Sequence, residues 1–304
     1  MKLLEALGGE CAGTVAFNSE EEPPLQLRTE YELSDECYAP VSDRDISGLI
    51  DQMESVPLVF SRRDFRLSLA GAQQKIALAH FGGKWFIPKG GAPSTHIIKP
   101  AQRDFLDIAR NEYLSMRLGG IFIGDVASPS MVDFCGKEAF CVRWFDRIQD
   151  GGPSVGDICR LLSERSSDPI ADMRKLLGAV IFQFLIGNCD VHGKNFSLLE
   201  DKDSVALGPA YDVVSTAIYP SLTRKLAMKI GNEYELDRIC RRHFIELADR
   251  FGVRISAVNK VLEGFEKRMP EAEAFLKGDK VALESPKLAS AIWEGFLARW
   301  RLIV

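Results

Sequence analysis

The sequence has few of the residues that mark a disulfide framework or a zinc site. Its seven cysteines are scattered along 304 residues without a CxxC pair, and it has four histidines. An odd number of dispersed cysteines is typical of free thiols in a reducing compartment. The composition therefore argues against a disulfide-stabilised scaffold and a structural zinc site, and it predicts a cytoplasmic protein.

The chain also lacks a long uninterrupted apolar segment. Residues 1–20 have no apolar core of the kind that signal peptides carry, and the longest apolar run, near 176–187, is broken by glycine and glutamine. We therefore expect no membrane association. A net charge of −5 provides no general attraction to nucleic acid. We therefore expect no direct nucleic-acid binding. Any role on nucleic acid would depend on a local patch or on a partner protein.

What is present is an ordinary globular composition, with 46% apolar and 27% charged residues. Residues 18–40 are acidic and contain prolines, as in a surface connection. Apolar residues recur at helical spacing over 43–55, and apolar and polar residues alternate over 65–100 across glycine-containing turns. These patterns predict a short helix followed by an antiparallel meander, which includes a short strand at 96–101.

Further along, the pattern predicts a helix over 111–120, two strands within 126–145, and mostly helices after a break near 146–153. The expected helices lie at 154–165, 171–187, 234–252, 256–269 and 285–304. In the last helix, Trp293 and Trp300 are seven residues apart and predict one buried face. We predict an α+β fold with two lobes, a β-rich lobe over 1–142 and a mostly helical lobe over 143–304.

Four polar residues gather in IGNCDVHGKNF, directly after an apolar run: Asp190, His192, Lys194 and Asn195. Asp190 and Asn195 have the spacing D-x-x-x-x-N, and Asp212 follows behind an expected hairpin. This is the order that phosphoryl transfer uses in kinase-type lobes, where an Asp accepts the hydroxyl proton and an Asn and a later Asp bind Mg²⁺.

The same cluster also fits a hydrogen-bonded turn after a buried helix, because Asp, Asn and Gly favour turns. The D-x-x-x-x-N spacing alone is a weak signal. The carboxylate downstream and the β-rich half upstream favour a phosphotransfer site over a turn.

A kinase also needs a phosphate-binding turn and a lysine. In SLAGAQQK, residues 68–75, small residues would let backbone N–H groups approach phosphate oxygens, although the stretch matches neither a Walker A motif nor GxGxxG and resembles an ordinary hairpin turn. Lys99 ends a short apolar strand, where it could reach the nucleotide phosphates, and Glu112 on the following helix could orient it.

Seven ordered stretches resemble the HipA-like serine/threonine kinases, the toxins of bacterial HipBA-type toxin–antitoxin systems. They are LSLAGAQQKIAL, IPKGGAPSTHIIKP, NEY, CVRWFDR, IGNCDVHGKNFS, PAYDVVS and KLAMKI. The resemblance extends from about residue 3 to the C-terminus. It implies a bilobal protein-kinase-like fold that uses ATP and Mg²⁺.

The resemblance also implies a role for each matching residue. Asp190 would be the catalytic Asp, with Lys99 as the ATP lysine and Asn195 and Asp212 as the metal ligands. Ser68 would be a site of autophosphorylation. The negative charge of the added phosphate group would repel the phosphates of ATP. The remaining nucleotide-binding residues would be Ala70, Gly71, Ala72, Gln73, Gln74, Lys75, Arg143, Trp144, Phe145, His192 and Tyr211.

The implied partners are a HipB-like DNA-binding antitoxin and a protein substrate, an aminoacyl-tRNA synthetase, whose phosphorylation stops translation. The sequence departs from the family pattern at two places. The usual N-terminal subdomain is missing, as in short HipT kinases, which implies a separate HipS-like small protein. A segment after Phe145-Asp146-Arg147 is also shortened.

Two alternatives stay open. The shortened segment is compatible with a pseudokinase, a nucleotide-binding scaffold that assists an antitoxin. A small-molecule phosphotransferase of the aminoglycoside type uses an Asp and an Asn at this spacing as well. Enzymes of that class have a His two residues before the catalytic Asp. This chain has Asn188 at that position, and its His192 comes two residues after Asp190.

Overall fold

The computed structural model describes residues 37–55, 75–89, 92, 94–102, 105, 107–143, 155–201, 204–250 and 252–304. They form two compact units. The first takes its described residues from Met1–Ala109 and Pro129–Asp146, and the second from Arg110–Ser128 and Arg147–Val304. The division of the chain into 1–142 and 143–304 stays a prediction, because residues 144–154 lie outside the described residues.

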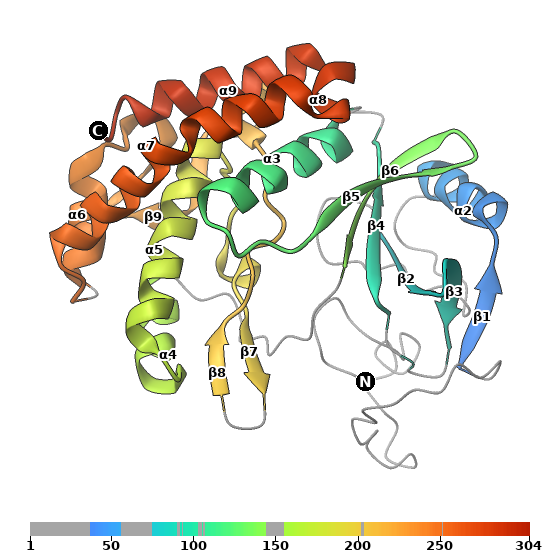
Figure 1. Ribbon diagram of the computed structural model, residues 1–304, viewed down its shortest axis with the longest axis horizontal. Coiled ribbons are helices and arrows are strands. Elements are labelled where there is room, and N and C mark those ends of the chain that lie inside the picture. The colour runs from blue at the N-terminus through green and yellow to red at the C-terminus, as the bar shows by residue number, and fades with distance from the viewer. Residues whose placement is uncertain are drawn as a thin grey trace. The chain divides into compact units, whose positions relative to one another are not determined.

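The first unit is built on a six-stranded antiparallel sheet with the strand order β1-β3-β2-β4-β6-β5 (Figure 1). The hairpin between β2 and β3 turns at Gly82 and Gly83, which both have positive φ angles that glycine adopts readily. The strands are β1 (Tyr38–Val41), β2 (Ile76–Phe81), β3 (Lys84–Pro88), β4 (His96–Pro100), β5 (Pro129–Phe134) and β6 (Lys137–Arg143). The expected strands and the β2–β3 hairpin are confirmed, but β4 pairs with β2 and not with β3, so the meander order that we expected is wrong.

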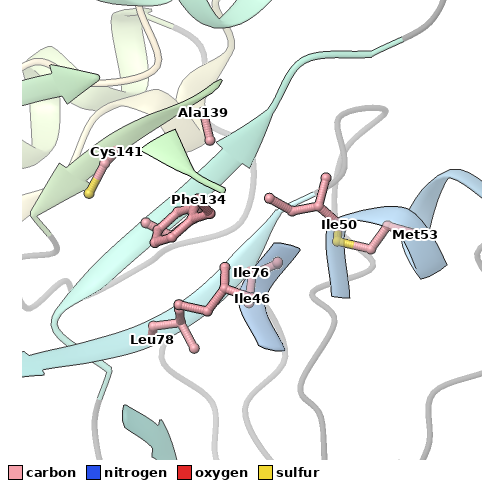
Figure 2. Close-up of a cluster of buried hydrophobic side chains, with 9 residues drawn as sticks. Ile46, Ile50, Met53, Ile76, Leu78, Phe134, Ala139 and Cys141 are labelled. Atoms are coloured by element: carbon pink, nitrogen blue, oxygen red, sulfur yellow. The ribbon is translucent and has the colours of Figure 1, made fainter. Parts of the chain in front are cut away.

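Helix α2 (Asp43–Ser55) covers one face of this sheet. Its apolar residues Ile46, Ile50 and Met53 recur at helical spacing and contact side chains of the sheet, as Figure 2 shows. Ile46 and Ile98 are fully buried in this cluster. The sheet and α2 therefore share one hydrophobic core, which fixes the strands that carry Lys75, Lys99 and Arg143.

The second unit is mostly helical (Figure 1). Its helices are α3 (Ile108–Phe122), α4 (Val155–Arg165), α5 (Pro169–Ile186), α6 (Arg241–Arg250), α7 (Ile255–Gly278), α8 (Lys280–Glu284) and α9 (Pro286–Trp300). Two small antiparallel hairpins interrupt them, β7 (Leu198–Asp201) with β8 (Ser204–Leu207), and β9 (Lys225–Ile230) with β10 (Glu233–Glu235). Antiparallel sheets and segregated helices confirm the α+β fold class.

Aromatic side chains form the centre of the helical unit. The ring of Phe122 on α3 lies within 5.9 Å of Phe182 on α5, within 5.2 Å of Phe265 on α7 and within 4.8 Å of Phe296 on α9. Trp293 stacks on Phe296 at 5.1 Å. Since aromatic side chains bury large apolar areas, this cluster holds the four helices together and gives α5 a rigid environment.

One predicted helix is shorter than expected. We expected a helix over 234–252, but residues 233–235 form β10, residues 236–238 form a 3₁₀ turn, and α6 begins at Arg241. Glu233 and Glu235 pair with Ile230 and Lys225 of β9 across the two-residue turn Gly231-Asn232, so a hairpin replaces the first turns of the expected helix. In the part of the chain that the structure describes, no helix is long and apolar enough to cross a membrane.

Candidate functional site

Helix α5 leads directly to Asp190. Asp168 caps its first turn by accepting a hydrogen bond from the Ala171 N–H at 3.0 Å, and Pro169 occupies the first helical position. The helix ends at Gly187, which adopts the left-handed conformation with a φ of 77°. Because α5 is buried along most of its length, the residues that follow Gly187 start from a fixed position.

Asn188 links the two loops that carry the predicted catalytic and metal-binding carboxylates. Its side chain is 1% exposed. The amide oxygen accepts from the Asp190 N–H at 3.1 Å, and the amide nitrogen donates to the Asp212 carbonyl at 3.2 Å and to Gln183 Oε1 at 3.0 Å. A fully bonded buried amide of this kind holds both backbones in one arrangement.

Asn195 makes a second link. Its Oδ1 accepts from the His192 N–H at 2.9 Å, which closes the 3₁₀ turn Gly193–Asn195. Its Nδ2 donates to Asp212 Oδ2 at 3.0 Å. The structure thus brings Asn195 and Asp212, the two predicted metal ligands, into direct contact.

The backbone of Asp212 is strained. Its φ is 57°, and only Cys135 shares a positive φ among the described non-glycine residues. A left-handed residue other than glycine persists where its surroundings hold it, and such residues gather at functional sites. Here Asn188 and Asn195 bind the backbone carbonyl and the side chain of the same residue.

The segment after Asp212 is joined to the end of α5. Thr216 Oγ1 donates to the Gly187 carbonyl at 3.1 Å and accepts from the Cys189 N–H at 2.8 Å, and Ser215 Oγ donates to the Ile186 carbonyl at 2.7 Å. The Ala217 N–H donates to the Gly187 carbonyl at 2.9 Å. The loop of Asp190 and the loop of Asp212 therefore form one hydrogen-bonded body.

Helix α3 supports that body from a distant part of the sequence. Asn111 is fully buried, accepts from the Ser215 N–H at 2.9 Å and donates to the Ser215 carbonyl at 3.0 Å. The side-chain amide thus bonds both the N–H and the carbonyl of Ser215, as a neighbouring β-strand would. These two bonds fix the position of residue 215. Asn111 is part of NEY, one of the stretches that carry the resemblance.

The ionisation of Asp190 depends on its surroundings. Although Asp190 as a residue is exposed, partial desolvation of its carboxyl group raises its pKa above the ordinary value. The effect of His192 opposes this shift, whereas the Asp212 carboxylate raises the pKa of Asp190 further. A cation bound between the two carboxylates would relieve their repulsion.

The donor atoms fit Mg²⁺. Asn195 and Asp212 offer an amide and a carboxylate oxygen, the hard ligands that Mg²⁺ takes together with waters and substrate phosphates. Within the described ranges, no group of three or more His, Cys, Asp or Glu side chains is placed to hold a metal.

The sheet unit holds the predicted nucleotide lysine. Lys99 on β4 is 6% exposed and its Nζ lies 5.7 Å from the centre of the Phe140 ring, over the opposite strand. Lys75 is half-buried just before β2, and Arg143 is exposed at the end of β6. Glu112 on α3 is 1% exposed, and its pairing with Lys99 stays a prediction.

Several predicted residues lie outside the described residues. They are Ser68, Ala70, Gly71, Ala72, Gln73, Gln74, Trp144 and Phe145. Their roles stay predictions. Of the others, Tyr211 is buried, and His192 is half-buried on the Asp190 loop.

The sequence pattern missed the residues that hold the site together. Asn188, Thr216 and Asn111 are all buried and bond the backbones on which Asp190 and Asp212 lie. The sequence around them gives little indication of this role, because Asn and Thr are also common in ordinary turns. A buried Asn or Thr inside an otherwise apolar stretch is the pattern that could have pointed to them.

Two solved structures have a similar fold. The toxin HipA of Shewanella oneidensis, in a complex with HipB and operator DNA, matches with a TM-score of 0.75 and 24% identity over 98% of this chain and 77% of that chain. The Helicobacter pylori kinase CtkA matches with a TM-score of 0.53 and 11% identity over 78% of this chain and 92% of that one. At these identities the likeness shows the fold, which is that of a kinase.

The sequence comparisons define the family. The HipA-like C-terminal domain matches residues 67–163 and 149–273. A Sinorhizobium fredii protein named as a kinase, Y4mE, is 32% identical over 300 residues, covering 90% of this chain and 71% of the relative. The serine/threonine-protein kinase toxin HipA of Shewanella oneidensis is 26% identical over 313 residues, covering 90% and 69%. The chain belongs to the HipA-like kinase family.

Proposed function

We propose that this chain is a serine/threonine protein kinase that transfers the γ-phosphoryl group of ATP and depends on Mg²⁺. The observation that carries the proposal is the contact between Asn195 Nδ2 and Asp212 Oδ2 at 3.0 Å, on the same hydrogen-bonded body as Asp190. A general base and two oxygen ligands on one rigid body are the parts that phosphoryl transfer requires.

In the proposed reaction Asp190 accepts the proton of the acceptor hydroxyl. The hydroxyl oxygen forms a bond to the γ-phosphorus, the bond from that phosphorus to the β–γ bridging oxygen breaks, and ADP leaves. Asn195 and Asp212 would hold Mg²⁺, which when bound neutralises charge on the phosphates. Asn188 keeps the Asp190 backbone in place through the bond to its N–H.

The lysine of the sheet unit completes the proposal. Lys99 would bind the α- and β-phosphates, and Ala70–Lys75 would form the phosphate loop. Arg143, Trp144 and Phe145 would contact the adenine, and His192 and Tyr211 would lie beside the nucleotide. The burial of Lys99 supports this role, because a charge-assisted bond from an ammonium group to a phosphate oxygen is strong where water is excluded.

We further propose that the kinase is the toxin of a HipBA- or HipBST-like toxin–antitoxin system. Its substrate would be an aminoacyl-tRNA synthetase, its inhibitor a HipB-like antitoxin, and Ser68 its site of autophosphorylation. A HipS-like small protein would be a further partner. The relative in complex with HipB and operator DNA and the relative named as a toxin kinase support this context.

The test is to incubate the full chain with γ-labelled ATP and Mg²⁺, with and without bacterial extract, and to compare it with Asp190→Ala. The exposed Asp249→Ala on α6 is the matched control. We expect label on Ser68 or on a synthetase for the wild type and Asp249→Ala, and none for Asp190→Ala. Label confined to small molecules would instead support a small-molecule phosphotransferase. ATP that binds without transfer of its γ-phosphoryl group would support a pseudokinase.

A further inference from the structure

A buried arginine from the C-terminal helix reaches the end of α5. Arg299 on α9 is 7% exposed, and its Nε–H donates to the Leu185 carbonyl at 2.8 Å. Leu185 lies in the last turn of α5, five residues before Asp190. The two residues are 114 positions apart in the sequence, so this contact exists only in the folded chain.

The charge of Arg299 has no carboxylate partner at ion-pair distance in the part of the chain that the structure describes, and its Nη2 has no hydrogen-bond acceptor there. Burial lowers the pKa of its guanidinium to about 10, and Arg224 adds repulsion, which Cys189 and Asp237 oppose. The carbonyl groups at the end of a helix attract a cation. The C-terminus of α5 is therefore the partner that the structure provides for Arg299.

Two glycines leave the space that the guanidinium occupies. A Cβ at Gly187 would lie 2.8 Å from Arg299 Nη2 and 2.9 Å from its Cζ, and a Cβ at Gly295 would lie 3.0 Å from Nη2. Gly187 also has the positive φ of a helix cap. The guanidinium therefore rests directly on the backbone residue where α5 ends and the catalytic segment begins.

From Gly187, hydrogen bonds continue to the segments next to Asp190 and Asp212. The Gly187 carbonyl accepts from Thr216 Oγ1 and from the Ala217 N–H, and Thr216 Oγ1 accepts from the Cys189 N–H. Residue 189 precedes Asp190, and residue 216 follows the Asp212 segment. A shift of the α5 terminus would consequently move the loops of Asp190 and Asp212 together.

We infer that Arg299 is a positioning residue, which holds the C-terminal end of α5 and thereby the segment that carries Asp190 in the geometry for phosphotransfer. The inference rests on the proposed function of Asp190. Arg299 touches no reacting atom in this scheme. It acts through the Leu185 carbonyl and Gly187.

The experiment uses the full chain and two independent perturbations. Arg299→Gln removes the cation, and Arg299→Lys restores the charge without the guanidinium. Gly295→Ala keeps Arg299 but places a Cβ 3.0 Å from Nη2, while alanine is the better helix former. The controls are the exposed Arg301→Gln and Gly264→Ala, where the nearest atom is Nη1 of another arginine, Arg268, at an ordinary 3.5 Å.

Two readouts are taken for each variant: the steady-state kinetics of labelled ATP turnover, and backbone hydrogen exchange in residues 188–192. We expect Arg299→Gln and Gly295→Ala to lower kcat about ten- to a hundredfold, since small displacements of reacting groups cost this much. The KM for MgATP should change less than about twofold. Exchange should accelerate in 188–192 but not in the β7–β8 hairpin, and Arg299→Lys should recover part of the kcat.

Normal kcat and unchanged exchange in both perturbed variants would overturn the inference. If Arg299→Gln does not fold, Gly295→Ala decides, because its helix is not weakened by the substitution. A wild type that turns over no ATP would reject the proposed function. If hydrogen exchange in 188–192 still depends on Arg299 in that case, the role of Arg299 in holding the end of α5 is supported. The two failures are therefore distinguishable.

Discussion

The side-chain amide of Asn195 donates a hydrogen bond to the carboxylate of Asp212 at 3.0 Å, across 17 positions of the sequence. The contact joins two loops that leave different elements, one after α5 and one after β8. Asn188 bridges the same loops through the Asp190 N–H and the Asp212 carbonyl. The proposed base and the proposed metal ligands are thus parts of one structure.

Removing the Asp212 carboxylate should weaken nucleotide binding only when Mg²⁺ is present. We expect Asp212→Ala to reduce MgATP affinity at least about tenfold. Mg²⁺ takes few protein ligands, so the loss of one removes a large share of its binding to the protein. Isothermal titration calorimetry with Mg²⁺ and with EDTA measures the difference. The exposed Asp249→Ala is the control. An Asp212→Ala variant that binds MgATP like the wild type would remove Asp212 from the metal site.

The buried Asn188 amide should matter for both stability and activity. Asn188→Ala leaves the Asp190 N–H and the Gln183 side chain without their partner, which costs about 1–3 kcal/mol in the free energy of unfolding. Denaturant unfolding measures this cost. The exposed Glu266→Ala on α7 should stay within about 0.5 kcal/mol of the wild type. Equal stabilities of the two variants would contradict the bridging role.

Asp190 should make the folded state less stable once it ionises. Its folded pKa is raised above the ordinary value of 3.8, by desolvation first, so the folded state holds the proton more tightly than the unfolded state. Stability is then lost as the pH rises from 3.8 through the folded pKa. Asp190→Asn should consequently raise the Tm at pH 7, and the gain should vanish at a pH below 3.8.

Asp45 provides the control of opposite sign. Hydrogen bonds from the Ser42 side chain and backbone lower its pKa, so its ionised form favours the folded state. Asp45→Asn should lower the Tm at pH 7 and lose its effect as the pH falls through the folded pKa. Scanning calorimetry from pH 3 to pH 8 separates the two variants. A Tm of Asp190→Asn below that of the wild type at pH 7 would refute the expected sign.

The buried Lys99 should contribute to ATP binding more than an exposed lysine of the same sheet. Lys99→Met replaces the ammonium by an apolar group of similar length, so the fold should tolerate it while the phosphates lose a charge partner. We expect MgATP affinity to fall at least about tenfold, measured by calorimetry. Lys84→Met, on the exposed start of β3, is the control and should bind normally. Equal affinities of the two variants would argue against the ATP lysine.

Local patterns were sufficient for most elements. The structure confirms the helix over 43–55, the strands β2, β3 and β4 and the buried face of α9, which all follow from periodicity. The pairing of β4 with β2 differs from the expected meander. Periodicity failed at 234–240, where pairing between β10 and β9 replaces the expected helical turns. The two strands are joined by the two-residue turn Gly231-Asn232, a local hairpin signal that the helical periodicity of 234–252 obscured.

The residues that could carry the chemistry are readable from the amino-acid sequence, because Asp190, Asn195 and Asp212 have side chains and spacings that suit one reaction. Their support is visible only in the folded chain. Asn111, Asn188, Thr216 and Arg299 come from separate elements, and their hydrogen bonds form only when those elements are packed together. The spacing of residues along the sequence indicates which functional groups a loop carries. The position of that loop depends on the packing of helices that are distant in the sequence.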